Sequence, residues 1–312
     1  MIALSPGRCR FVPNVKIAVT GASGFVGRAL CSHLERLEHK VLRLTRFPTG
    51  ARNEVHWDPV AGDLNLRDVA GSHAFVNLAG ENIADGRWSA DKKRLIRVSR
   101  VYGTRALSEL LGEMSTPPKV LVSASAIGFY GDRGTLGLDE DSASGDGFLA
   151  GVCREWEAAT ERAAAKGIRV VHARLGTILG ANGGALQKML PAFSRGLGGV
   201  MGPGDQVMSW IALEDATRAI LHVLTHDGIH GAVNLVSPNP VTNREFTTAL
   251  AQVIEKPTFL PMPSFVAQII MGEMAKELLL ASVRVVPRVL DETHYEFHYP
   301  QLEQALRAAL GS

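Results

Sequence analysis

Three glycines near the start of the chain have a spacing that could hold a phosphate group. Gly21, Gly24 and Gly27 form a G-x-x-G-x-x-G pattern directly after the apolar run 15–20. Such a loop makes a tight turn, lets backbone N–H groups approach a pyrophosphate, and opens a helix whose N-terminus attracts the anion. A purely structural turn is the alternative, but the position between a strand and a helix favours a dinucleotide site. The residues expected at the pyrophosphate are Gly21, Ser23, Gly24, Phe25, Val26 and Gly27.

A charge at the end of the next apolar run indicates which dinucleotide binds. The run 40–45 is followed by Arg46, where an NAD-selective protein usually places a carboxylate for the ribose 2′-hydroxyl. A guanidinium there would instead pair with a 2′-phosphate, with Thr45 and Arg43 as further contacts. We therefore expect NADP, with NADPH as its reduced form, rather than NAD. The alternative is a solvated surface arginine.

Apolar runs separated by longer amphipathic stretches must position these residues. Strands are expected at 15–20, 40–45, 74–78, 119–123, 169–174 and 232–236, and helices at 25–37, 92–111, 148–166 and 215–226. Strands that are apolar throughout and alternate with helices predict an α/β fold with a Rossmann-like doubly wound parallel sheet. We expect this domain over 15–237, with 181–214 contributing to a smaller, mostly helical substrate-side lobe formed by 238–312, and a tail at 1–14.

Composition and charge narrow the functional classes. The chain of 312 residues carries 33 basic and 31 acidic residues, a formal net charge of +2, which gives no support for binding nucleic acid or anionic lipid. Its 3 cysteines lie far apart and are odd in number, which favours a reducing compartment. The most apolar long segment, 265–283, contains three charged residues, so no membrane span is expected. We predict a cytoplasmic protein with a small-molecule substrate.

Several motifs resemble those of one protein family. The segments 77–83, 123–131 and 174–180, with Trp156 and Trp210, resemble the epimerase-like subfamily of atypical short-chain dehydrogenase/reductases, within the NAD-dependent epimerase/dehydratase family. Members of this subfamily carry a C-terminal domain of unknown function, and the resemblance covers nearly the whole chain after residue 14. The further cofactor contacts expected here are Asn77, Leu78, Ala79, Gly80, Arg100, Ser123 and Arg174.

One of these contacts departs from the family pattern. Extended members of the superfamily often carry an asparagine turned toward the cofactor, at the position where Arg100 precedes Gly103 and Thr104. Two interpretations of Arg100 are open at this point. It contacts the phosphates of the cofactor, or it pairs with a nearby carboxylate.

The catalytic pair of the superfamily is missing from this chain. The resemblance implies a Tyr-x-x-x-Lys pair on the helix after the fifth strand, yet Leu149 and Cys153 stand at those positions and the motif occurs nowhere in the sequence. The remaining candidates are Ser125, Tyr130 as a proton donor or as an aromatic lining residue, Asn82 as a substrate-positioning group, and Glu81 as a base. Cys153 is expected to be a small buried helix residue, since a nucleophile needs a lowered pKa.

The expected function is that of an NADP-binding, epimerase-like oxidoreductase acting on a small organic or sugar-nucleotide substrate. A non-catalytic NADP-binding redox sensor or scaffold is the alternative, because the phosphate loop is present and the Tyr-Lys pair is not. No metal site is predicted: His222, His226 and His230 are spaced by four, but a helix end at Asp227 takes His230 out of register. The glycine-rich segment 198–205 is expected to shape a mobile lid, with Trp210 lining the site or filling a lobe interface.

Overall fold

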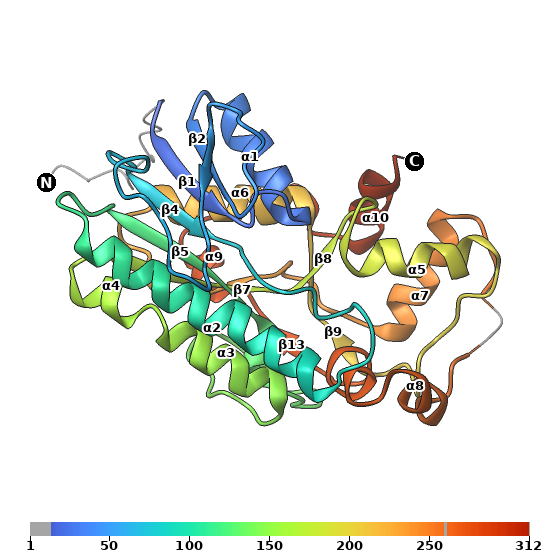
Figure 1. The fold of residues 1–312 in the computed structure, drawn as a ribbon. Helices are drawn as coiled ribbons and strands as arrows, with labels where there is room; N and C mark the ends of the chain where they lie inside the picture. The colour runs from blue at the N-terminus through green and yellow to red at the C-terminus, as the bar shows by residue number, and fades with distance from the viewer. Residues whose placement is uncertain (1–13, 259–260, 312) are drawn as a thin grey trace, which may run out of the picture.

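The chain folds around one parallel sheet of seven strands in the order β11-β7-β5-β4-β1-β2-β3 (Figure 1). The computed structural model describes residues 14–258 and 261–311, so the tail predicted at 1–14 lies almost wholly outside the described residues. The strands are β1 (Lys16–Thr20), β2 (Lys40–Thr45), β3 (Glu54–His56), β4 (Ala74–Asn77), β5 (Val120–Ala126), β7 (Arg169–Leu175) and β11 (Gly231–Leu235). The predicted Rossmann-like, doubly wound parallel sheet is confirmed.

The strand order reverses at β1. This strand pairs with β2 on one side and with β4 on the other, so the chain crosses the sheet in both directions from its first strand. At the carboxyl end of β1, Thr20 stands opposite Leu44 of β2 and Asn77 of β4. In open α/β sheets, ligands bind outside the strand ends at this reversal. The expected phosphate loop therefore begins at the position where the topology places a ligand.

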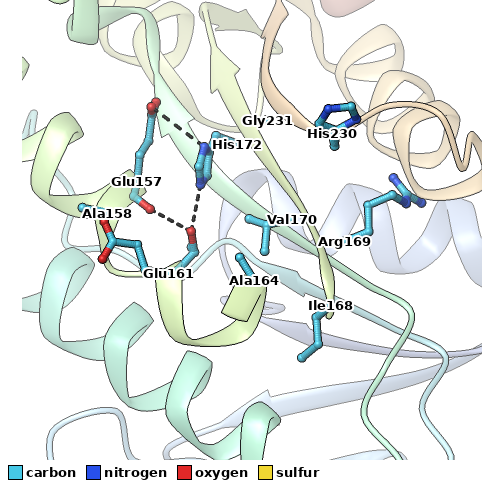
Figure 2. Close-up of a pocket in the computed structure, with 11 residues that line it drawn as sticks. Glu157, Ala158, Glu161, Ala164, Ile168, Arg169, Val170, His172, His230 and Gly231 are labelled. Atoms are coloured by element: carbon cyan, nitrogen blue, oxygen red, sulfur yellow. Dashed lines mark hydrogen bonds and ion pairs between the residues drawn. The ribbon is translucent and has the colours of Figure 1, made fainter. Parts of the chain in front are cut away.

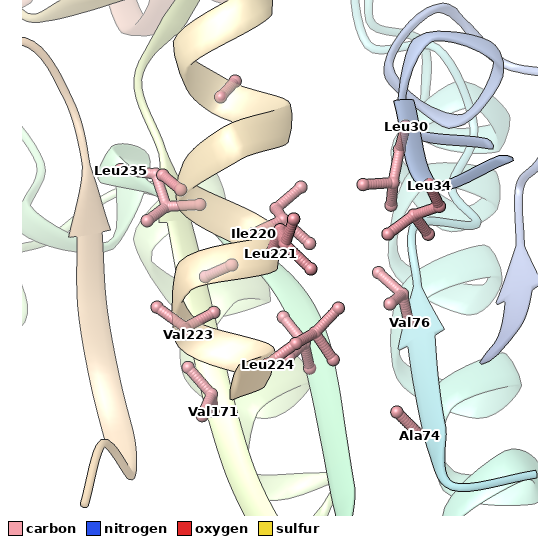
Figure 3. Packing of buried hydrophobic residues seen from close by; sticks show 14 of the residues in the cluster. Leu30, Leu34, Ala74, Val76, Val171, Ile220, Leu221, Val223, Leu224 and Leu235 are labelled. Atoms are coloured by element: carbon pink, nitrogen blue, oxygen red, sulfur yellow. The ribbon is translucent and has the colours of Figure 1, made fainter. Parts of the chain in front are cut away.

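Helices cover both faces of the sheet. On one face, α1 (Phe25–Arg36) and α6 (Leu213–Thr225) pack against the strands through buried aliphatic side chains, among them Leu30, Leu34 and Ile220 (Figure 3). The other face is covered by α2 (Ala90–Glu113), α3 (Phe148–Ala158) and α4 (Glu161–Ala165). Strands buried on both faces explain the runs of apolar residues in the sequence.

Two local predictions were wrong. The single helix predicted over 148–166 is divided into α3 and α4 by a turn at Ala159 and Thr160, where the N–H of Thr160 donates to the backbone oxygen of Glu157, three residues earlier, at 3.2 Å. Strand β3 was not predicted, since its three residues contain a single aliphatic side chain and give no apolar run.

A second group of elements lies beyond the strand ends and is mostly helical, as predicted. Trp210, Phe246 and Leu186 are at its centre. Its elements are β8 (Thr177–Leu179), α5 (Gly184–Ser194), β9 (Val207–Met208), β10 (Trp210–Ala212), β12 (Val241–Thr242), α7 (Asn243–Val253), α8 (Ser264–Met271), the π-helical turn η2 (Ala275–Leu279) and α10 (Leu302–Leu310). The short strands β6 (Gly137–Leu138) and β13 (Arg284–Val285) pair with each other, and η1 (Ile127–Tyr130) follows β5.

The C-terminal segment also returns to the sheet. Helix α9 (Arg288–Glu292) contacts β11, and Leu290 belongs to the same buried cluster as α1 and α6. The buried carboxylate of Asp215 accepts hydrogen bonds from the backbone N–H groups of His298 and Tyr299 at 2.8 Å each. These bonds fix the end of the chain against the start of α6.

Candidate functional site

The glycine-rich loop forms a close-fitting backbone turn at the end of β1. Gly21 has a φ of +66°, and a Cβ atom there would lie 2.7 Å from the backbone of Leu78. A Cβ atom on Gly27 would lie 2.1 Å from the carbonyl oxygen of Gly21, so only glycine fits. Helix α1 begins directly after Gly24 and carries no acidic residue in its first turn. Its N-terminus is thus open to an anion, and the loop fits the pyrophosphate of a dinucleotide.

Phe25 joins this loop to the second group of elements. Its ring lies against the backbone of the segment between β8 and α5, where a Cβ atom on Gly183 would approach ring carbon Cδ2 to 2.2 Å. Because Phe25 is the first residue of α1, the N-terminus of α1 lies near that of α5.

A row of hydrogen-bonded polar side chains fixes the strand ends beside the loop. Thr20, Asn77 and Ser123 stand opposite one another in the register of β1, β4 and β5. Thr20 donates to Asn77 at 2.6 Å, and the Asn77 amide donates to Ser123 at 3.3 Å and to Thr104 of α2 at 2.7 Å. Because Asn77 and Ser123 are buried, their side chains hold the strands in place. This arrangement leaves the backbone from Leu78 to Gly80 available to contact a ribose.

The expected 2′-phosphate site lies on the surface at the end of β2. Arg46 is exposed, and no carboxylate lies within ion-pair distance of it in the described part of the chain. Arg43, expected as a helper, instead donates to both carboxylate oxygens of Glu35 at 2.7 and 2.9 Å. Arg46 is therefore the cation at this strand end that is left for a ligand.

Ser125 takes part in a buried network centred on Glu157 of α3. The Ser125 hydroxyl donates to Glu157 Oε1 at 2.7 Å, and Arg174 binds both carboxylate oxygens at 2.9 Å each. Ser125 is only 2% exposed. A hydroxyl has one proton to donate, and here Glu157 receives it, so Ser125 has none left for a substrate in this arrangement.

Tyr130 and Arg174 do not have the roles expected of them. Tyr130 is fully buried; its hydroxyl donates to Asn234 at 2.7 Å and accepts from Arg174 at 2.9 Å. Burial raises the pKa of Tyr130, although Arg174 opposes this. Arg174 is 5% exposed and fully engaged. The structure thus contradicts Tyr130 as a proton donor to substrate and Arg174 as a cofactor contact; both hold the core together behind the strand ends.

The residues after β4 lie at the surface. Asn82 is exposed and its side-chain oxygen accepts from the N–H of Ala84 at 3.0 Å, while Glu81 forms an ion pair with Lys92 at 2.6 Å. The Glu81 carboxylate is thus already bound to a neighbouring side chain. Asn82 remains accessible to a substrate.

Helix α3 is the helix on which the Tyr-x-x-x-Lys pair was expected, and it contains Leu149 and Cys153. Cys153 is buried, and burial raises the pKa of its thiol to about 11, which makes it a poor nucleophile. The N–H groups of Phe148 and Leu149, at the start of α3, donate to the two carboxylate oxygens of Glu277 at 2.8 Å each. Glu277 comes from η2 in the C-terminal segment, and no local sequence signal predicted this contact.

An open pocket of about 470 Å³ is lined by Glu157 of α3 and by residues of α4, β7 and the start of β11 (Figure 2). His172 of β7 points toward Glu157 across 3.9 Å and shares a hydrogen bond of 2.9 Å with Thr160. Burial lowers the pKa of His172. None of the predicted cofactor contacts lines this pocket.

Further expectations concern the second group of elements. Trp210 is fully buried and its indole N–H donates to the backbone of Asn239, which supports the interface alternative.

His222 and His226 stack with ring centroids 4.1 Å apart. Within the described residues, no group of three His, Cys, Asp or Glu side chains could hold a metal ion. The predicted lid segment is tied to the C-terminal part, since Gly202 and Met262 share a backbone hydrogen bond of 2.8 Å.

Two protein-family models match this chain. Residues 17–235 match the model of the NAD dependent epimerase/dehydratase family, and residues 262–309 match a domain of unknown function, DUF1731. The chain belongs to the NAD dependent epimerase/dehydratase family. The resemblance inferred from the motifs is thereby confirmed, and the chain has the NAD(P)-binding fold of this family.

Relatives match along nearly the whole chain. An epimerase family protein of Mycobacterium leprae is 40% identical over 94% of this chain and 95% of its own length. The structure of human epimerase family protein SDR39U1, solved with NADPH, has a TM-score of 0.88 and 33% identity, covering 96% of this chain and 100% of the human one. A nucleoside-diphosphate sugar epimerase from Corynebacterium glutamicum has a TM-score of 0.79 and 36% identity, covering 96% of this chain and 58% of that one. Among the described residues, no helix is both long and apolar enough to cross a membrane.

Proposed function

We propose that this chain is an NADP-dependent, epimerase-like oxidoreductase that acts on a small organic or sugar-nucleotide substrate. The observation that carries the preference for NADP is Arg46, an exposed guanidinium at the end of β2 with no ion-pair partner in the described residues. A carboxylate at this position would repel a 2′-phosphate, whereas a guanidinium attracts it. The human relative solved with NADPH is consistent with this preference.

The chain's own residues would bind the cofactor along the strand ends. The backbone of residues 21–27 and the N-terminus of α1 would hold the pyrophosphate, and the backbone of residues 78–80 would line the ribose. Thr45 and Arg46 would contact the 2′-phosphate. When bound, the nicotinamide would supply hydride transfer. We also propose that the two domains extend over 15–237 and 238–312. The protein is then cytoplasmic and binds no nucleic acid.

A second candidate function rests on the state of the catalytic residues. Ser125 donates its proton to Glu157, Tyr130 is buried and Cys153 is held neutral. None of them offers a free proton donor at the strand ends where the cofactor would bind, which is what a redox sensor or scaffold that binds NADPH without turnover would show. Asn82, exposed after β4, is the polar group that an enzyme would still have for its substrate.

One experiment separates the two functions. The purified chain is first titrated with NADPH by calorimetry, and is then incubated with NADPH and a metabolite extract while the absorbance of the reduced nicotinamide is followed. Binding together with consumption of NADPH would establish the enzyme, with an N82A variant expected to lose turnover and keep cofactor binding. Binding without consumption, and without epimerisation of any sugar nucleotide in the extract, would favour the sensor, because an epimerase returns its hydride and consumes no cofactor. Failure to bind NADPH would refute both.

A further inference from the structure

A small open pocket lies at the end of α5, among the elements beyond the strand ends. It has a volume of about 140 Å³ and is enclosed by α5, the segment 197–201 and Met262. Of the described residues, those that line it are apolar or glycine, and they include Met189 and Met201. Methionine side chains are flexible and adapt to apolar ligands. Such an open hollow leaves apolar surface in contact with water until a ligand covers it.

Backbone contacts hold the walls of this pocket in place. The N–H of Met262 donates to the carbonyl oxygen of Val200 at 2.9 Å, and the N–H of Gly202 donates to that of Met262 at 2.8 Å. The backbone of Gly198 lies against the ring of Phe193, where a Cβ atom would approach ring carbon Cγ to 2.5 Å. The pocket is therefore formed before a ligand arrives, which lowers the cost of binding.

The pocket is separate from the proposed cofactor site, although α5 connects the two. Gly184, at the start of α5, lies near Phe25 of the phosphate loop. Ala192, which lines the pocket, is about 12 Å farther along the helix axis, at 1.5 Å per residue. None of the residues expected to contact NADP lines the pocket. A ligand here would occupy a site of its own, whose existence does not depend on the proposed function.

Two cations lie next to the pocket. Arg195 belongs to the turn that closes α5, and Pro257, which follows Lys256, lies against Gly196 of the same turn. Arg195 and Lys256 are exposed, and neither forms an ion pair in the part of the chain that the structure describes. Arg195 donates one N–H to a backbone oxygen at 3.3 Å, which leaves the other donors of its guanidinium for a ligand. The charge beside this apolar pocket thus favours an anion.

We infer that the pocket binds the tail of an amphipathic anion, an aliphatic chain that ends in a carboxylate. An apolar cavity of about 150 Å³ accommodates a ring of six carbon atoms, so this pocket of about 140 Å³ would hold about six carbons of the chain. The tail would lie among the methionines, and its carboxylate would reach Arg195 and Lys256. A hollow of this size takes a narrow chain, whereas a folded partner needs about 800 Å² of complementary surface.

Calorimetry with a series of fatty acids tests the pocket. The Kd should fall about fourfold for each methylene from butanoate to octanoate, and by less beyond octanoate, because the longer chain leaves the pocket. Ala192→Phe fills the pocket from the exposed surface of α5 and should raise the Kd of octanoate about tenfold or more. Gln187→Phe is the matched control, since Gln187 is exposed on the same helix and does not line the pocket. It should leave the Kd of octanoate unchanged.

Arg195→Gln tests the anionic end of the ligand. It should weaken octanoate by about twofold to fivefold, as expected for loss of an exposed ion pair. It should leave the Kd of 1-octanol unchanged, because octanol has the same chain length and no charge. An equal loss for both ligands would overturn the assignment of an anion to this site.

A second copy of the chain and a membrane surface are the alternative occupants. Helix α8 begins two residues after Met262 and exposes Phe265 and Ile269. A wild type that sediments as a dimer, with A192F a monomer and no octanoate bound, would assign the pocket to a second copy. Vesicles of phosphatidylglycerol that bind wild type and A192F equally but not Phe265→Ser, again without octanoate binding, would assign the surface to a membrane. Either result overturns the inference.

Equal binding of octanoate to the wild type and A192F would also overturn the inference, because the ligand would then lie elsewhere. NADPH titrations of the same variants keep this inference distinct from the proposed function. Wild type, A192F and Q187F should bind NADPH equally, since the pocket is remote from the phosphate loop. If NADPH does not bind the wild type, the proposed function fails, while the fatty-acid series still decides what the pocket binds.

Discussion

The pair formed by Glu157 and Arg174 provides a sharp test of how burial sets the strength of an ion pair. Their side chains are 11% and 6% exposed, and Arg174 donates two hydrogen bonds of 2.9 Å to the carboxylate. Burial by itself lowers the pKa of Arg174, but its bonds to Glu157 and Tyr130 outweigh this and leave the pKa raised. Glu157→Gln keeps the volume and an acceptor for Ser125 but leaves Arg174 without a counter-charge. Breaking a buried pair in this way costs about 3–5 kcal/mol.

The matched control is Glu303→Gln. Glu303 accepts two hydrogen bonds from Arg307 at 3.0 and 2.8 Å, but these side chains are 53% and 47% exposed. An exposed pair contributes about 0–1 kcal/mol. Urea unfolding followed by circular dichroism should therefore show a free energy of unfolding lowered by several kcal/mol in E157Q and almost unchanged in E303Q. Equal effects of the two substitutions would refute the reasoning that burial makes Glu157 the centre of the network.

Three further predictions concern the phosphate loop, the histidine pair and the α3 cap. Gly27→Ala places a Cβ atom 2.1 Å from a backbone oxygen, so it should abolish NADPH binding in calorimetry and destabilise the fold by about 2 kcal/mol; Gly228→Ala, with no atom within 4 Å, should do neither. The pKa of His222 is lowered to about 4 by burial and by His226, so the folded state binds fewer protons than the unfolded one between about pH 4 and 6.5. Stability should fall as the pH drops through this window and fall less in His222→Gln; an identical pH dependence in the variant would contradict this. Glu277→Ala removes the acceptor for the first N–H groups of α3 and should lower the free energy of unfolding in urea by about 1 kcal/mol; an unchanged value would show that solvent replaces the cap.

The fold could be predicted because its signals are local. Apolar runs such as 15–20 and 74–78 become buried parallel strands, and the glycine spacing after the first run marks the strand–helix turn. The division between α3 and α4 was missed because neither Ala159 nor Thr160, at the turn, is a glycine or a proline that would mark a helix end. Strand β3 was missed because three residues carry too little pattern.

The site was less predictable because its key contacts join distant segments. No role was expected of Glu157 from the sequence, yet it binds Ser125 and Arg174 from two strands. Glu277 lies 128 positions from Leu149, whose N–H it accepts. Tyr130 was expected as a proton donor or an aromatic lining residue, but its side chain turns into the core toward Asn234. Sequence order gives the strand end on which a residue lies, but it does not give the direction of the side chain.

Dissociation constants of NADPH and NADH, measured side by side for the wild type and for Arg46→Asp, test the central claim most directly. The claim is that the exposed Arg46 at the end of β2 recognises the 2′-phosphate. The wild type should bind NADPH more tightly than NADH, and the substitution should weaken NADPH by about tenfold or more while changing NADH by less than about twofold. An equal loss for both dinucleotides, or no binding of either to the wild type, would contradict the account.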